Sequence, residues 1–184
     1  MTNNTFFTAD LHICHTNIIK IRGFDNNDDY HNLLINNWNN KVDKNDLTYI
    51  LGDVIWKSDG VEIIKQLNGR KRIIKGNHDH TPDLKHMKKQ NIIEQFSDCE
   101  GVTIYDSVAD KDRYIYLSHY PHRSWNRSYH GSLHFYGHIH NTIDDWGLST
   151  DVGVDKWNHT PVSFDELMIY FKDRIDNFKK GDMK

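Results

Sequence analysis

Five short clusters of histidine, aspartate and asparagine hold the side chains of this sequence that could do chemistry. They are Asp10-x-His12, Gly52-Asp53, Gly76-Asn77-His78-Asp79, His119 and Gly137-His138-Ile139-His140. The candidate metal ligands among them are Asp10, His12, Asp53, Asn77, His119, His138 and His140. Imidazole, carboxylate and amide donors without cysteine suit Mn, Fe, Zn, Ni or Mg better than copper(I) or an iron–sulfur cluster. These seven ligands are too many for one structural zinc ion, so they predict two divalent ions that share one carboxylate.

Each cluster follows a β-prone run of residues. The runs 5–9, 47–51 and 72–75 precede the first three clusters, and the runs 113–117 and 132–136 precede the last two. Helical spacing of apolar residues between the first three runs predicts parallel strands joined by crossover helices. Ligands of such sheets bind beyond the carboxyl ends of the strands, so we expect the clusters to converge on one pocket.

The second half of the sequence has a different pattern. Strand-like runs at 102–105, 113–117 and 132–136 follow one another with few helical signals between them, which predicts a second, more antiparallel sheet. Apolar residues recur at helical spacing over 164–178 and predict an amphipathic helix there. With 37% hydrophobic and 12% aromatic residues, the 184-residue chain has enough apolar material for one domain spanning 1–184.

Composition also limits the location and the partners that we expect. No apolar run has the length of a membrane span, and the first residues lack a signal or transit pattern, so we expect a cytoplasmic protein without a membrane partner. Cys14 and Cys99 are too few for a disulfide framework. The formal charge of -3 gives no general attraction to nucleic acid, which is therefore an alternative substrate that the charge does not favour.

Taken in order from Asp10 to His140, the clusters resemble the motif series of the calcineurin-like metallophosphoesterases, in particular the short single-domain bacterial and phage type. The resemblance implies an α/β fold, a two-sheet β-sandwich flanked by helices in four αββα layers. It also implies a role for each ligand: one ion would be bound by Asp10, His12 and His140, the other by Asn77, His119 and His138, with Asp53 bridging them and His78 just outside the metals.

The chemistry implied is hydrolysis of a phosphate ester by a hydroxide held between the two ions. Mn is the expected metal, with Fe, Zn, Ni and Mg as alternatives. His78 would act as the general acid that protonates the leaving alkoxide. Asp79 is expected to orient His78 because it is the next residue.

The substrate needs hydrogen-bonding or cationic partners besides the metals. Arg123, four residues after His119, is the first candidate, and His15 and Asn17 follow the first cluster closely enough to contact the substrate. Arg22 lies on the same segment and is expected at the rim of the pocket. The last candidates are the aromatic residues Trp125, Tyr129 and Trp146, which could stack on a base of the substrate. For all three, packing against other side chains of the protein is favoured over such stacking.

Several functions would share this site. We expect hydrolysis of a small phosphodiester, such as a cyclic nucleotide or a nucleotide conjugate, with phosphomonoesterase and nuclease activity as alternatives. A non-catalytic scaffold that binds protein partners is the alternative from another class. A protein phosphatase is less favoured, because that class follows the second aspartate with Asp-Arg-Gly, whereas Asp53 is followed by Val54-Ile55-Trp56-Lys57. The oligomeric state, the physiological substrate and the native metal stay open.

Overall fold

The first sheet consists of four parallel strands and one short antiparallel strand. The computed structural model describes residues 4–179. The strands are β1 (Thr5–Thr8), β2 (Leu47–Ile50), β3 (Arg70–Ile74), β4 (Gln95–Ser97) and β9 (Val162–Ser163). Their order is β4-β3-β2-β1-β9, and β1 pairs in parallel with β2 and antiparallel with β9. The carboxyl ends of β1, β2 and β3 therefore lie at one edge of the sheet.

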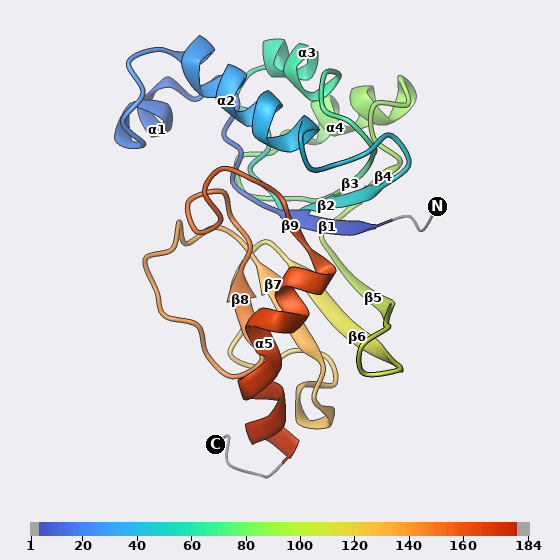
Figure 1. Cartoon of the computed structure of the whole chain (residues 1–184). Helices are drawn as coiled ribbons and strands as arrows, with labels where there is room; N and C mark the ends of the chain where they lie inside the picture. The colour runs from blue at the N-terminus through green and yellow to red at the C-terminus, as the bar shows by residue number, and fades with distance from the viewer. Residues whose placement is uncertain (1–3, 180–184) are drawn as a thin grey trace.

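Helices cover one face of this sheet, and the second sheet lies on its other face (Figure 1). The helices are α1 (Thr16–Ile21), α2 (Asn27–Asn39), α3 (Val61–Ile64) and α4 (Thr81–Lys89). The Asn26 side chain caps α2 by accepting a hydrogen bond from the backbone N–H of Asp29. Tyr30, Leu34 and Trp38 recur at four-residue spacing, so they lie on one helix face and are buried against the sheet.

The second sheet is mixed, and its long antiparallel pair agrees with the expectation of a more antiparallel sheet, although its other two strand pairs are parallel. Its strands, in spatial order, are β5 (Cys99–Asp106), β6 (Lys111–Ser118), β7 (Leu133–Tyr136) and β8 (Ser149–Asp151). Only β5 and β6 form an antiparallel hairpin, whereas β6–β7 and β7–β8 are parallel. Long connections after β6 and β7 allow these crossovers. As a result β6 and β7 run in the same direction, and the loops that follow them lie at the same end of the sheet, next to the first sheet.

Apolar side chains on the two faces of the first sheet enter two different cores. Phe6 packs with the helices, while Phe7, pointing to the opposite face, packs between the sheets, because successive strand residues alternate in direction. The rings of Phe7 and Phe135 lie 4.9 Å apart in an edge-on arrangement that joins the two sheets. The second core continues to Phe171 of α5 (Phe164–Lys179), the helix predicted over 164–178.

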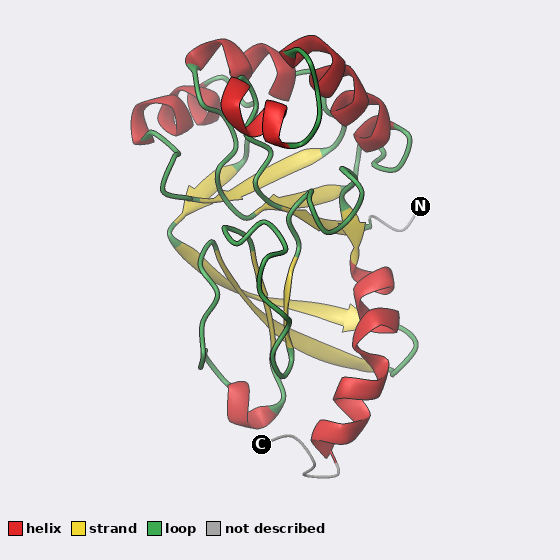
Figure 2. Ribbon diagram, turned by 90° about the vertical axis from the view of Figure 1, so that its left-hand side faces the viewer, coloured by secondary structure: helices red, strands yellow, loops and turns green. Residues whose placement is uncertain are grey.

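The observed order of layers is helices, sheet, sheet and helix, as Figures 1 and 2 show. The predicted α/β fold of two sheets flanked by helices is therefore confirmed. Figure 2 looks onto the edge where loops gather between the two sheets. Among the helices within residues 4–179, none combines the length and the apolar character that a membrane crossing requires.

Candidate metal centre

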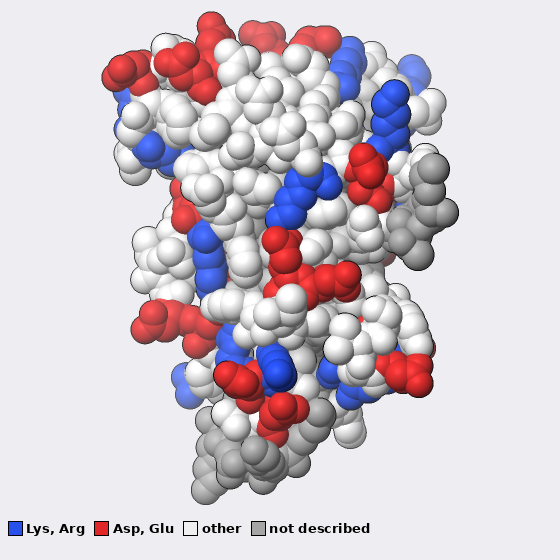
Figure 3. Space-filling view, viewed as in Figure 1, with Lys and Arg blue, Asp and Glu red and all other residues white. Residues whose placement is uncertain are grey.

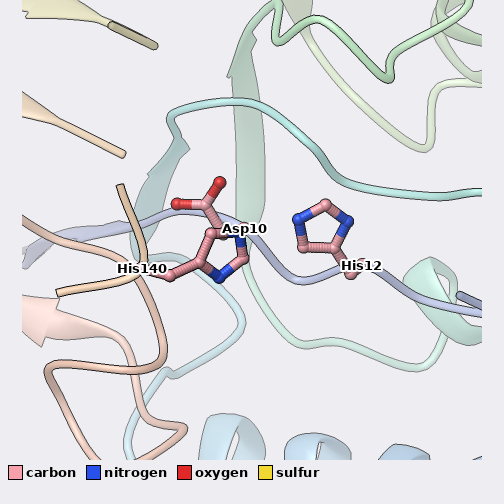
Figure 4. Close-up of side chains that lie close together, drawn as sticks. All are labelled: Asp10, His12 and His140. Carbon is pink, nitrogen blue, oxygen red and sulfur yellow. The ribbon is translucent and has the colours of Figure 1, made fainter. Parts of the chain in front are cut away.

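The loops that follow β1, β2, β3, β6 and β7 bring the predicted ligands together in two groups. Asp10, His12 and His140 form one group, which Figure 4 shows, and Asp53, His119 and His138 form the other. Within each group the ligand atoms lie within 4.8 Å of one another. The amide oxygen of Asn77 lies 3.0 Å from Nε2 of His119 and so adjoins the second group. All seven predicted ligands are therefore placed in one site.

The carboxylate of Asp53 faces both groups. Its Oδ2 lies 3.7 Å from Nε2 of His12, and its Oδ1 lies 3.5 Å from Nε2 of His119. Asp53 is 2% exposed, so water competes little for these oxygens. This placement is what a carboxylate shared by two ions requires.

The backbone at the ligands is unusual. Asp10, His12, Asp53, His138 and His140 all have positive φ angles, between 46° and 72°. Such angles are uncommon for residues other than glycine and cost about 1–3 kcal/mol each. Their concentration at five of the seven ligands indicates that the tertiary structure maintains a strained geometry at this site.

Two glycines next to ligands permit a close approach of the loops. A Cβ atom at Gly52, whose φ is 93°, would overlap Nδ1 of His119. A Cβ atom at Gly76 would overlap the Asp53 carboxylate. Glycine is therefore the residue that these positions tolerate, because His119 and Gly76 lie against Gly52, and Asp53 lies against Gly76.

Two buried ligand atoms in the first group have no hydrogen-bond partner among the described residues: Oδ1 of Asp10 and Nε2 of His12. Burial, followed by the charge of Arg22, lowers the pKa of His12 to about 2, so its imidazole is neutral at neutral pH. Burial, followed by the charges of Asp151 and Asp53, raises the pKa of Asp10 well above its usual value. A divalent cation would satisfy both free atoms and offset the repulsion between the carboxylates, so these residues fit a metal.

In His119 and His140, a hydrogen bond at Nδ1 orients the imidazole so that Nε2 can bind a metal. Nδ1 of His119 lies 2.7 Å from the backbone oxygen of Leu51, and Nδ1 of His140 lies 2.7 Å from Oδ2 of Asp155. Donation from Nδ1 leaves Nε2 unprotonated and available as a ligand atom. Asp155 was not anticipated from the sequence, because it belongs to none of the clusters.

Asp155 also forms a forked ion pair with Arg22. Nε and Nη2 of Arg22 donate to the two carboxylate oxygens over 2.7 and 2.6 Å, and Nη2 also donates to the backbone oxygen of Asp10. Burial alone would raise the pKa of Asp155, but the hydrogen bonds from His140 and Arg22 lower it below its usual range. The Arg22 side chain is only 4% exposed, so it does not lie at the rim where it was expected. It is instead buried next to the ligands, in contact with Asp155 and the backbone of Asp10.

Asp79 also differs from its expected role. One carboxylate oxygen accepts from the backbone N–H of Val54, and the other accepts from those of Asp53 and Gly76, over 2.8–2.9 Å. The carboxylate therefore holds the loops after β2 and β3 together and does not orient the His78 imidazole. Adjacency in sequence was misleading because consecutive residues of this loop point in different directions.

His78 lies at the mouth of the site. Its side chain is 37% exposed, and Nε2 lies 3.9 Å from Oδ2 of Asp53. The backbone N–H of His78 donates to Oδ1 of Asp53 over 2.9 Å, which fixes the loop to the shared carboxylate. The rings of His15 and Trp56 lie 6.0 and 5.2 Å from the His78 ring. His15 is thus brought to the site as expected, whereas Trp56 was not anticipated.

The other two predicted substrate residues lie on the surface. Asn17 is exposed on α1, and Arg123 is exposed in the loop after β6. Within residues 4–179, neither side chain forms a hydrogen bond or ion pair with a predicted ligand, so substrate contact by either stays a prediction. Trp125 is buried and donates from Nε1 to Ser132, as the packing interpretation predicted. Tyr129 and Trp146 are exposed.

A pocket with a volume of about 720 Å³ adjoins the second group of ligands. Asn77 and His119 are among its lining residues, as are Lys75, Tyr120 and His122. The Tyr120 ring lies 4.7 Å from the His138 ring and 5.1 Å from the His119 ring. Two of the seven predicted ligands therefore border this pocket.

Replacing Asp155 with Asn is expected to weaken the binding of Mn²⁺ to the first group by about 10- to 100-fold, since outer hydrogen-bond partners of metal ligands have effects of this size. The amide introduced by this substitution carries no charge, so it would no longer balance the charge of Arg22 or hold the His140 imidazole as strongly. Isothermal titration of the metal-free protein measures the change, with Asp144→Asn, an exposed residue of the loop after β7, as the control. Equal affinities in the two variants would contradict this role of Asp155.

Comparisons with known proteins give relatives in archaea and phages. No family model matches the chain. It is 32% identical over 176 residues to the uncharacterized protein MJ1445 of Methanocaldococcus jannaschii, a match that covers 89% of this chain and 88% of the archaeal protein. It is 28% identical to the Gene 66 protein of Mycobacterium phage L5, over 90% of this chain and 92% of the phage protein.

Two solved structures resemble this fold. A protein of unknown function from Aquifex aeolicus, AQ665, superposes with a TM-score of 0.67 at 23% identity and covers 92% of this chain and 100% of its own. An archaeal phosphodiesterase superposes with a TM-score of 0.50 at 18% identity, over 82% of this chain and 83% of its own. At these identities the likenesses establish the shared fold.

Proposed function

This chain belongs to the protein family of MJ1445 from Methanocaldococcus jannaschii, and from its metal centre we propose that it is a dinuclear metal-dependent phosphoesterase. One observation carries the proposal: the buried Asp53 carboxylate faces imidazole nitrogens of both ligand groups. The resemblance of the ligand series to the calcineurin-like metallophosphoesterases agrees with it, as does a fold shared with an archaeal phosphodiesterase.

In this proposal Asp10, His12 and His140 hold one divalent cation, and Asn77, His119 and His138 hold the other, with Asp53 shared. Mn²⁺ is the first choice, and Fe, Zn, Ni and Mg are alternatives, because the donors are oxygen and imidazole nitrogen. Such ions, when bound, lower the pKa of water toward neutrality and stabilise negative charge that develops on phosphoryl oxygens. The protein keeps its imidazoles in the metal-binding tautomer through Leu51 and Asp155.

His78 is the proposed general acid. Its imidazole is half-exposed beside Asp53, so it can reach both the bound ester and bulk solvent. In this position it would hold a proton and donate it to the leaving oxygen as the ester bond breaks. Asp79 contributes indirectly, because its carboxylate fixes the backbone on both sides of the ligand loops.

A small phosphodiester is the proposed substrate class. A phosphodiester has a second ester group that needs space beside the metals, and the pocket of about 720 Å³ next to Asn77 and His119 provides it. Lys75 and His122 in its lining could contact an anionic or polar part of that group. A phosphomonoesterase remains the alternative. A nuclease is less favoured, because the formal charge of -3 gives no general attraction to nucleic acid. On the face that Figure 3 shows, acidic and basic side chains are interspersed. The cytoplasmic location stays a prediction.

The proposal is tested by metal removal and by a panel of substrates. Treatment with a chelator is expected to abolish hydrolysis of bis-p-nitrophenyl phosphate, and Mn²⁺ is expected to restore it, because the free ligand atoms require a cation. The panel compares bis-p-nitrophenyl phosphate, p-nitrophenyl phosphate, cyclic nucleotides and dinucleotides with Mn²⁺, Ni²⁺, Zn²⁺ and Mg²⁺.

The outcomes separate the alternatives. Faster cleavage of diesters than monoesters supports the proposed class, and the reverse order identifies a phosphomonoesterase. Cleavage of long single-stranded DNA but not of dinucleotides identifies a nuclease. A metal-replete protein that hydrolyses none of these esters would leave the non-catalytic scaffold as the better interpretation.

A further inference from the structure

A second pocket lies at the end of β3 that is opposite the metal centre. Its volume is about 390 Å³, and it is formed by the end of α3, the turn before β3 and the segment after α4. Three lysines, Lys44, Lys65 and Lys71, line it, together with the amide side chains of Asn68 and Asn91. None of its lining residues is Asp or Glu. Ile64, Leu67 and Ile92 give the lining an apolar part, and lysines are its only charged residues.

Lys71 occupies a position that normally takes an apolar residue. Side chains two residues apart in a strand point to the same face, so Lys71 and Ile73 share the helix-covered face of the first sheet. Ile73 belongs to the hydrophobic core on that face. Lys71 is only 5% exposed, whereas lysine is almost never this deeply buried without a partner.

The ammonium group of Lys71 has a neutral hydrogen-bond acceptor and, in the described part of the chain, no counter-charge. Nζ donates one hydrogen bond, over 2.8 Å, to the backbone oxygen of Gly69. Among residues 4–179, no carboxylate lies within ion-pair distance of it, and burial lowers the pKa of Lys71 to about 8. A buried ammonium with one neutral acceptor has a large desolvation cost, and an anion would offset that cost.

The other two lysines of the lining are Lys44 and Lys65. Lys44 is exposed before β2, and Lys65 follows α3, where it also pairs with Glu62 over 2.6 Å. Figure 3 shows Lys and Arg side chains next to Asp or Glu side chains on the upper right of the molecule, the region in which Figure 1 places α4 and β4. Three ammonium groups that border one cavity suit a compact, multiply charged oxyanion.

We propose that the pocket bordered by Lys44, Lys65 and Lys71 binds a phosphate group at a site separate from the metal centre. The strand β3 (Arg70–Ile74) separates the two sites, because Gly69 precedes it and Asn77 follows it. A phosphate in this pocket does not contact the metal ligands. The site would take either free phosphate or the phosphate of a nucleotide, since the lysines recognise the same oxygens in both.

The test is an NMR titration of the full-length, metal-free protein at constant ionic strength, with sodium phosphate in one arm and adenosine monophosphate in the other. Saturable shifts of the backbone amide signals of Gly69, Lys71 and Asn91 are expected in at least one arm. Shifts with phosphate alone identify free phosphate as the ligand, and shifts with both show that a nucleotide phosphate also fits. Saturable shifts in neither arm would overturn the proposal.

Variants show whether the lysines bind the anion. Lys71→Met keeps the length of the side chain in a core-facing position, and it should weaken binding by about ten-fold or more, the effect of losing one charge-assisted hydrogen bond. The surface double variant Lys44→Gln/Lys65→Gln keeps the core intact and should also weaken binding. Lys89→Gln, an exposed lysine outside the lining, should bind as the wild type does.

Two results would contradict this assignment. Unchanged affinity in both Lys71→Met and the double variant would show that the pocket is not the binding site. Loss of the signal shifts in His119→Ala, with the lysines intact, would show that the anion binds at the metal ligands. Because the titration uses metal-free protein and measures no turnover, its result is independent of the phosphoesterase proposal.

Discussion

Asp53→Asn is expected to lower kcat/KM for a phosphodiester by about 10³-fold or more. The reason is that Asp53 is the carboxylate facing both ligand groups, and losing its charge weakens the binding of both cations. The charge stabilisation that metal ions provide is worth several kcal/mol, and about 4 kcal/mol corresponds to 10³-fold in rate. Steady-state kinetics with Mn²⁺ measures the effect, and elemental analysis of the dialysed protein should find fewer than two ions per chain.

The control for this prediction is Asp112→Asn, which changes an exposed aspartate on the β5–β6 hairpin, outside both ligand groups. It should keep the metal content and the activity of the wild type. In Asp53→Asn the side chain would still have an oxygen that can accept the hydrogen bond from the His78 backbone N–H, so the loop after β3 should stay in place. Two tightly bound ions and wild-type activity in Asp53→Asn would disprove the shared-carboxylate arrangement.

His78→Ala should reduce kcat by about 10²–10⁴-fold for an ester with a poor leaving group while the metal content stays unchanged. The loss follows from removing the proton donor, because His78 is not a member of either ligand group and lies half-exposed at the mouth of the site. For p-nitrophenyl esters the loss should be much smaller, since that leaving group departs without protonation.

Comparing the two kinds of ester separates acid catalysis from a general structural effect. A misfolded or metal-depleted variant would lose both activities equally, so an unequal loss is the informative result. His86→Ala, an exposed histidine of α4, is the matched control and should leave both rates unchanged. Equal rates for His78→Ala and the wild type on an alkyl ester would rule out the general-acid role.

The sequence identified the candidate ligands because metal chemistry restricts residue types and strand ends restrict their positions. Asp10, Asp53 and Asn77 follow β1, β2 and β3, and parallel strands end at the same edge of a sheet. Periodicity likewise located the helix at 164–178 and the buried face of α2, since apolar spacing reflects local geometry.

Local patterns were insufficient where a contact spans a long distance in sequence. Arg22 was expected at the rim, yet it is buried because Asp155, a distant residue, supplies its counter-charge. Asp79 was expected to orient His78, yet its carboxylate binds the amides of two different loops. The second sheet was expected to be more antiparallel, and its longest pair is; the parallel pairing of β6 with β7 was not predicted, since it depends on how the long connection crosses and not on the strand residues themselves.

The amino-acid sequence alone thus determined which side chains can bind metal, in what order they follow the strands, and which helices have an apolar face. Only the tertiary structure decided that Asp53 lies between the two ligand groups and that Asp155 and Arg22 form hydrogen bonds to His140 and to the backbone of Asp10. It also decided that Lys71 is buried with no carboxylate partner among residues 4–179. The physical reason is that donor chemistry and periodicity are properties of short segments. Burial and charge compensation depend on which distant segments the fold brings into contact.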